Sequence, residues 1–333
     1  MTERSALLAF WKNYDRKAVL RYAQMADELG YDSFWLPEAW AYEVFSLLTE
    51  IAVTTKNIKI GTGIVNVFSR SPGLLAMQAA TLDEISEGRL LLGMGTSGPN
   101  VVEGFHGVPY KKPLTRMRQY IKVVQTLLAG GRLSEAGADM WEFRHFKLEM
   151  TPARDRVPIY CACLNEKAIR MIGEVADGWM PTFWPYTRLD EGHKWIAEGA
   201  AKAGRDPADI DTSPFTTVIP MPNEEDSYNS ARGLISFYIG GMGDYYKAML
   251  TRMGFGENCE IVDRLYKEKK RAEAAAAVSQ EMLDALVIAG EPDFCRERLG
   301  EWRAAGVGLP ILTLPTDMGP EICDWYMQEL APS

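Results

Sequence analysis

The chain has 333 residues, of which 47% are hydrophobic, and its formal net charge at pH 7 is -9. That length can bury a large core. The Lys and Arg residues are dispersed, which argues against a nucleic-acid partner and favours a small-molecule ligand. No apolar run of about eighteen residues predicts a membrane span. The apolar core of the first residues is too short for a signal peptide, so we expect a cytoplasmic protein.

The first third of the chain alternates short apolar runs with amphipathic segments. The runs at 6–11, 33–37, 58–67 and 89–95 predict strands, and the segments at 16–30, at 44–55 and from about 72 predict helices. Gly30 ends the first helical pattern and is a candidate left-handed cap. Such an alternation implies parallel strands joined by right-handed crossovers.

The pattern resumes after a looser stretch. Helices are predicted at 114–128, 166–175, 188–203, 293–305 and 321–330, and strands at 157–163, 178–182, 213–220 and 310–315. Residues 141–150 alternate bulky and charged side chains, which predicts a hairpin or an extended loop. Eight strand–helix units predict an α/β protein with a (β/α)8 TIM barrel, formed as a single domain by residues 1–333.

Residues 223–288 are about twice as long as a single crossover requires, and their pattern is helical. We expect a helical insertion between the seventh and eighth strands. At that position an insertion lies over the loop end of the barrel, where active sites occur, so a lid is one interpretation. A homodimer surface is the other.

The loops that follow the strands are where a barrel of this kind builds its site. They are rich in aromatic and small polar residues and contain few charges, which suits a flat, conjugated ligand. The residues at these positions are Trp11, Asn13, Glu38, Trp40, Gly63, Ile64, Asn66, Arg70, Ser97, Gly98, Glu103, His106, Leu164, Asn165, Glu166, Thr182, Phe183 and Trp184.

The sequence contains few motifs by which side chains alone could carry out catalysis. The three histidines are not at ligand spacing from one another, so no metal site is expected. The five cysteines contain no C-x-x-C and are expected to be small buried hydrophobes. The partial matches GTGIV and GMGTSG do not complete a G-x-G-x-x-G loop. Difficult chemistry would therefore come from a bound cofactor.

Three stretches make the comparison with a known family specific: YDSFWLPEAW, the long run from IKIGTGIVNVFSRSPG through SGPNVVEGFHGVPYKKPL, and PIYCACLNEKAIRMIGEVADGWMP. From about Ala6 to Leu314 the chain resembles the bacterial luciferase-like flavin superfamily. Within it, the chain is most similar to the coenzyme F420-dependent oxidoreductases compared with methylenetetrahydromethanopterin reductase. The resemblance implies a luciferase-like barrel and the deazaflavin coenzyme F420, with FMN as the alternative cofactor.

The resemblance also implies which residues hold the cofactor. A non-prolyl cis peptide between Gly63 and Ile64 would support one face of the ring, and backbone amides at 164–166 would hold the cofactor phosphate. Arg188 or Arg252 would supply a charge beside that phosphate. The full set of expected cofactor contacts is Trp40, Thr62, Gly63, Ile64, Val65, Asn66, Ser97, Gly98, Leu164, Asn165, Glu166 and Thr182.

The acid/base candidates depart from the pattern of some relatives, which have an Asp-His pair after the second strand. Here Glu38 keeps a carboxylate at that position and is a candidate to accept or deliver a proton. Its alternative role is a helix cap or a salt bridge. Glu103 and His106 are further catalytic candidates, with structural hydrogen bonds as the alternative.

Three functions follow from these observations. The leading one is hydride transfer between the deazaflavin coenzyme and a small organic substrate. The second is an FMN-dependent luciferase-like monooxygenase. The third is a non-catalytic barrel that keeps a ligand site without the acid/base.

Overall fold

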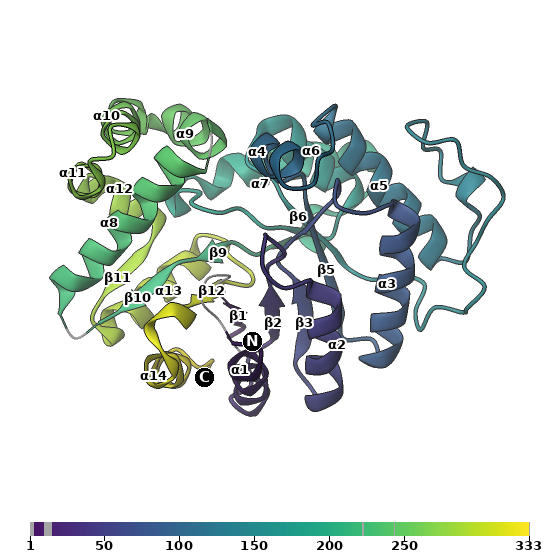
Figure 1. Cartoon of the computed structure of the whole chain (residues 1–333), viewed down its shortest axis with the longest axis horizontal. Coiled ribbons are helices and arrows are strands. Elements are labelled where there is room, and N and C mark those ends of the chain that lie inside the picture. Colours follow the sequence, from purple (N-terminus) through teal and green to yellow (C-terminus); the bar gives the residue numbers. More distant parts are fainter. Residues whose placement is uncertain (1–2, 10–14, 222, 243, 333) are drawn as a thin grey trace.

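Short parallel strands alternate with helices along the computed structural model, which describes residues 3–9, 15–221, 223–242 and 244–332 (Figure 1). The first elements are β1 (Ala6–Ala9), α1 (Arg16–Glu28), β2 (Ser33–Leu36), α2 (Val44–Thr54), β3 (Lys59–Thr62), β4 (Val65–Asn66), α3 (Pro72–Ile85), β5 (Leu90–Gly95) and α4 (Pro99–Gly104). Gly30 has a φ of 78°, as expected for a left-handed residue after α1. The predicted site positions Trp11 and Asn13 lie outside the described residues.

The remaining elements follow the same alternation until the insertion. They are α5 (Pro113–Leu128), β6 (Ile159–Ala162), α6 (Glu166–Val175), β7 (Gly178–Trp179), α7 (Leu189–Ala203), β8 (Asp211–Thr212), β9 (Phe215–Thr216) and β10 (Val218–Pro220), then the insertion helices α8 (Glu224–Gly241), α9 (Asp244–Leu250), α10 (Gly256–Lys267), α11 (Arg271–Ala276) and α12 (Gln280–Leu286), and finally β11 (Ile288–Gly290), α13 (Pro292–Ala304), β12 (Ile311–Leu314) and α14 (Pro320–Glu329).

The strands close into a ring. They pair in the order β8-β7-β6-β5-β3-β2-β1-β12-β9, with β4 also paired to β5, and the pairs are parallel. The two ends of this order, β8 and β9, belong to one continuous segment, so the sheet closes on itself. The TIM-barrel prediction is confirmed.

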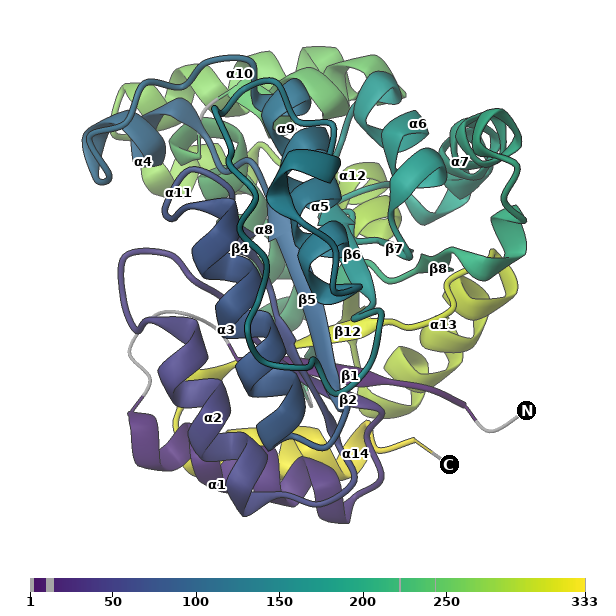
Figure 2. The same cartoon turned by 90° about the vertical axis from the view of Figure 1, so that its right-hand side faces the viewer.

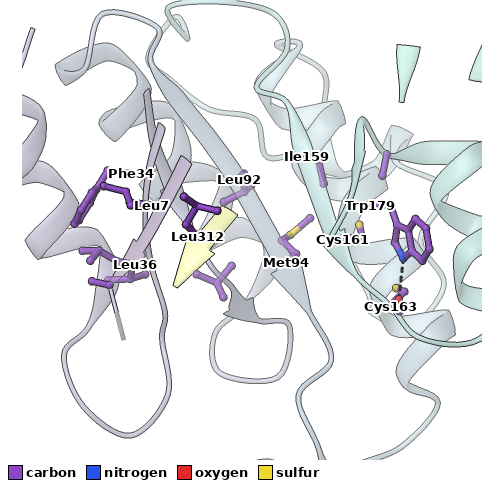
Figure 3. Packing of buried hydrophobic residues seen from close by; sticks show 14 of the residues in the cluster. Leu7, Phe34, Leu36, Leu92, Met94, Ile159, Cys161, Cys163, Trp179 and Leu312 are labelled. Atoms are coloured by element: carbon purple, nitrogen blue, oxygen red, sulfur yellow. Dashed lines mark hydrogen bonds between the residues drawn. The ribbon is translucent and has the colours of Figure 1, made fainter. Parts of the chain in front are cut away.

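Side chains alternate between two buried clusters on either side of the strands. The outer cluster lies between the strands and the helices and includes Leu7, Phe34, Leu92 and Trp179 (Figure 3). Trp179 is fully buried there and donates its indole N–H to the Cys163 carbonyl at 2.9 Å. The inner cluster fills the ring and consists of Ala6, Leu8, Trp35, Leu91, Tyr160, Met180, Leu309 and Ile311. The five cysteines are all buried, as expected.

Two expectations about local structure need correction. The predicted seventh strand at 213–220 is split into β9 and β10, and the segment that closes the ring begins earlier, at Asp211. The insertion ends in a strand, because β11 pairs in parallel with β10 from Ile288 onward. Residues 141–150 form an extended loop, which is one of the two predicted forms. The helix α4 was not predicted.

Part of the insertion lies at the same end of the molecule as α4 and α6. In both views α9 and α10 are at this end, opposite α1 and α14 (Figures 1 and 2). That placement agrees with a lid, whereas the homodimer stays a prediction. No helix in the described part of the chain is long and apolar enough to cross a membrane.

Candidate functional site

The carboxyl ends of the parallel strands meet at one end of the barrel, so the predicted site residues can be compared there. The peptide bond between Gly63 and Ile64 is cis, as the family resemblance implies. Gly63 donates its N–H to the Leu36 carbonyl at 2.7 Å, and a Cβ at Gly63 would lie 2.8 Å from Leu8 Cδ1. Ile64 packs against the inner cluster. This segment therefore forms an apolar floor beneath the loops.

Asn66 adds a polar group above that floor. Val65 and Val67 belong to the outer cluster, so Asn66 lies on the opposite face of the segment, the same face as Ile64. The side chain is buried, and its Oδ1 accepts the Phe68 N–H at 2.9 Å. Its Nδ2 has no hydrogen-bond partner among the described residues. A buried donor without a partner requires an explanation, and a bound ligand is one.

The side chains of Thr62 and Val65 face away from this position. The Thr62 hydroxyl accepts the Gly93 N–H and donates to the Gly93 carbonyl, both at 2.8 Å, and is fully buried between β3 and β5. Val65 lies in the outer cluster. Only the main chain of these two predicted contacts is left to meet a ligand.

Glu38 is part of a buried ion pair. Its Oε2 accepts from Arg70 Nη2 at 2.5 Å, and the side chains of Glu38 and Arg70 are 10% and 9% exposed. Ser69 Oγ and the Val44 N–H lie 3.5 and 3.4 Å from the same carboxylate. The salt bridge that was the alternative role for Glu38 is thus observed. Arg70 Nη1 is buried and has no partner among the described residues, which leaves a second spare donor.

The loop after β5 is organised by Tyr110. Its hydroxyl donates to Thr96 Oγ1 and to the Ser97 carbonyl, both at 3.2 Å, and its N–H donates to Glu103 Oε1 at 3.0 Å. Ser97 has a φ of 53°, and Gly98 precedes the first turn of α4. The predicted catalytic residue Glu103 is exposed.

The other predicted residue of this loop, His106, is half-buried beside Phe105, with ring centroids 5.1 Å apart. Tyr110 was not predicted as a site residue. Its role depends on contacts with Thr96, Ser97 and Tyr245, which only the folded chain brings together. The hydroxyl of Tyr245, which lies 135 residues further along the chain, donates to the Tyr110 hydroxyl at 3.1 Å.

The loop after β6 brings a cation to the predicted phosphate position. Asn165 caps α6 by accepting the Ala168 N–H at 3.0 Å, and Arg252 Nη2 donates to the Leu164 carbonyl at 2.8 Å. Arg188 instead pairs with Glu191. Of the two arginines considered for the phosphate, Arg252 is the one whose contacts lie at this loop.

The remaining predicted contacts lie at the edges of the site. Glu166, the first residue of α6, pairs with Arg170. Thr182 forms an isolated parallel bridge with Phe215, and the adjacent Phe183 packs edge-on against Tyr238 of the insertion. Trp40 is 44% exposed.

A cavity of about 680 Å³ lies at the opposite end of the barrel. Its lining includes Arg4, Arg156, Asp177 and Asp211, which come before or at the starts of strands, and His193 of α7. The charges are already matched, since Arg4 pairs with Asp211 and Arg156 with Asp177. In this fold the chemistry lies at the other end. Among the described residues, no group of three or more His, Cys, Asp or Glu is placed to hold a metal ion.

Fold and loops together define an α/β barrel with a candidate ligand site at its carboxyl end. The model of the luciferase-like monooxygenase family matches residues 7–308. The chain therefore belongs to the luciferase-like monooxygenase family.

Individual relatives are similar over most of their length. The chain is 28% identical over 329 residues to a candidate coenzyme F420-dependent oxidoreductase of Mycobacterium tuberculosis, covering 92% of this chain and 93% of the relative. It is 31% identical to the 5,10-methylenetetrahydromethanopterin reductase of Methanolobus tindarius, covering 87% of each chain. The solved structure of the coenzyme F420-dependent tetrahydromethanopterin reductase of Methanopyrus kandleri matches with a TM-score of 0.79, 25% identity and 98% coverage of both chains. Oxidoreductase is the enzyme class that these comparisons support.

Proposed function

We propose that this chain uses coenzyme F420 to transfer a hydride to or from a small organic substrate at the carboxyl end of the barrel. The unpartnered, buried Nδ2 of Asn66 on the same face as Ile64 carries the proposal. A flat deazaflavin ring has carbonyl oxygens that would accept from such a donor, and its face would rest on an apolar floor. The identity to named reductases supports the same cofactor.

The residues present fit the cofactor in two places. The ring would lie over the Gly63–Ile64 segment, with Asn66 Nδ2 and Arg70 Nη1 as spare donors. The phosphate would lie at the N-terminus of α6, where the amides of residues 165 and 166 and the guanidinium of Arg252 favour an anion. When bound, the deazaflavin supplies a carbon that carries the hydride.

The chain's own residues would bind, orient and protonate. Glu38 would hold Arg70 in place through the buried ion pair. Ser97 and Gly98 would face the ring edge, Trp40 and Thr182 would border the site, and Glu103 and His106 stay proposals for acid/base roles on the same loop.

A second function is favoured by the family itself, whose description names monooxygenases. An FMN-dependent enzyme would use the same floor and the same phosphate position. The two functions differ in which cofactor binds tightly and in whether oxygen is consumed.

Titration of the purified apoprotein with coenzyme F420 and separately with FMN, followed by tryptophan fluorescence, tests the proposal. Asn66→Asp keeps an oxygen for the Phe68 N–H but replaces the spare donor with a carboxylate oxygen. We expect about tenfold to hundredfold weaker coenzyme F420 binding. Asn229→Asp makes the same change of charge on an exposed face of α8 and serves as the control. Tight FMN binding without coenzyme F420 binding would overturn the proposal.

A further inference from the structure

Tyr110 lies where the barrel loops meet the insertion. Its ring packs against Phe68, which follows β4, with centroids 5.1 Å apart. Its hydroxyl reaches Thr96 Oγ1 and the Ser97 carbonyl directly after β5. The Tyr110 side chain thus contacts both the loop after β4 and the loop after β5, and each of these loops carries predicted cofactor contacts.

Tyr245 of α9 continues this contact to the surface. Its hydroxyl donates to the Tyr110 hydroxyl at 3.1 Å, and its side chain is 45% exposed. Three hydroxyl groups, those of Tyr245, Tyr110 and Thr96, therefore form a continuous chain of hydrogen bonds. The chain runs from solvent to the first residue after β5.

Hydride addition to a carbonyl or imine also requires a proton, because the oxygen or nitrogen takes the electron pair of the broken π bond. Of the carboxylates at this end, Glu38 is paired with Arg70, whereas Glu103 is exposed and accepts the Tyr110 N–H. Burial raises the pKa of Tyr110 above its ordinary value. A neutral phenol can accept one hydrogen bond while it donates another, which is what passing on a proton requires.

We propose that the hydroxyl groups of Thr96, Tyr110 and Tyr245 form a proton path between solvent and the reacting atom of a carbonyl or imine substrate. The inference rests on the proposed function. In the reductive direction the substrate carbon gains the hydride of the reduced deazaflavin, which is oxidised, and the substrate oxygen or nitrogen takes the Thr96 hydroxyl proton. Thr96 regains a proton from Tyr110, Tyr110 from Tyr245, and Tyr245 from water. The net change is one hydride and one proton added to the substrate.

Tyr110→Phe removes the middle hydroxyl and keeps the ring that packs against Phe68. The assay follows anaerobic oxidation of reduced coenzyme F420 by a panel of ketones, aldehydes and cyclic imines, in water and in deuterium oxide. We expect kcat to fall about tenfold to hundredfold, the coenzyme Kd to stay within about twofold, and the solvent isotope effect to change. Thr96→Val should show the same loss. Tyr228→Phe removes a hydroxyl whose one hydrogen bond to the described residues goes to Glu224 on the same helix, and it should behave as wild type.

The path also predicts how the variants combine. Tyr245→Phe should cause a smaller loss than Tyr110→Phe, because water can reach Tyr110 once the outer hydroxyl is gone, and the double variant should equal Tyr110→Phe. Hydrogen exchange of the apoprotein gives a readout apart from activity: Tyr110→Phe and Tyr245→Phe should each increase exchange in residues 244–250. Unchanged exchange would contradict the contact.

The kinetic and binding measurements distinguish failure of the proton path from failure of the proposed function. Unchanged kcat in Tyr110→Phe, or a change in coenzyme Kd alone, would show that Tyr110 only packs and would overturn the proton path. Coenzyme binding without oxidation by any member of the panel would overturn the path and its substrate class but leave cofactor binding intact. Absence of coenzyme binding by the wild type would overturn the proposed function and the path together.

Discussion

The Glu38–Arg70 pair predicts a large and specific loss of stability when its carboxylate is removed. Glu38→Gln leaves the Arg70 guanidinium, only 9% exposed, opposite a neutral amide. Removing one partner of a buried pair costs about 3 to 5 kcal/mol, and the glutamine oxygen keeps one hydrogen bond, so we expect about 3 kcal/mol. For 333 residues the unfolding entropy is about 0.7 kcal/mol per kelvin, so the melting temperature should fall by about 4 °C.

Calorimetry and denaturant unfolding measure this loss against a matched control. Glu43→Gln changes a carboxylate 3.8 Å from the same guanidinium. Glu43 is 46% exposed and caps α2 by accepting the Phe45 and Ser46 N–H groups, of which glutamine can keep one, so its loss should be about 1 kcal/mol. Adding Arg70→Met to Glu38→Gln should restore part of the stability, because the unpaired buried charge is gone. Equal losses in Glu38→Gln and Glu43→Gln would refute the reasoning.

The same variant separates two roles for Glu38 in the proposed reaction. If Glu38 positions Arg70, the coenzyme Kd of Glu38→Gln should rise and kcat should follow cofactor occupancy. If Glu38 is instead the acid, as one sequence interpretation holds, kcat at saturating coenzyme should fall while the Kd stays constant.

Two further predictions concern stability. Burial lowers the pKa of His193 below its ordinary value, so the unfolded chain binds more protons there and stability should fall as the pH drops below about 6.5. His193→Gln, which can still contact Thr212, should flatten the dependence of the denaturant midpoint on pH between about pH 7 and pH 5. An unchanged slope would contradict this. Gly93→Ala would place a methyl group 1.9 Å from the Thr62 carbonyl oxygen and should lower the free energy of unfolding by about 3 kcal/mol or more. Gly98→Ala is the control, because a Cβ at Gly98 meets nothing within 4 Å. Equal unfolding midpoints for the two alanine variants would refute the packing argument.

The barrel was predictable because its strands are short apolar runs between amphipathic helices with clear ends. Gly30 marks the end of α1, and the alternation of Leu7 and Leu8 reflects the two faces of β1. The elements that were not predicted are too short to show a periodic pattern of apolar residues. For example, β11 has three residues and directly follows a helical run. The seventh strand is split because β9 pairs with β12 whereas β10 pairs with β11, and a local pattern does not contain these partners.

The site was predictable as a set of loops but not as a set of contacts. Glu38 and Arg70 could both be placed at strand ends from the sequence. They are 32 residues apart, however, so their pairing depends on the tertiary structure. From the sequence, Thr62 was interpreted as a small polar residue of a site loop. Only the pairing of β3 with β5 shows that its hydroxyl is hydrogen-bonded to the Gly93 main chain. Spare donors such as Asn66 Nδ2 can be recognised only after every other contact of the residue is known.

Transfer of deuterium from reduced coenzyme F420, labelled at the ring carbon that carries the hydride, tests the central claim most directly. The reaction is run without oxygen, with a carbonyl or imine acceptor, and the product is analysed by mass spectrometry. The account predicts one deuterium on the product carbon. Product that forms only with reduced FMN and oxygen, and that carries an oxygen atom instead of the label, would contradict it.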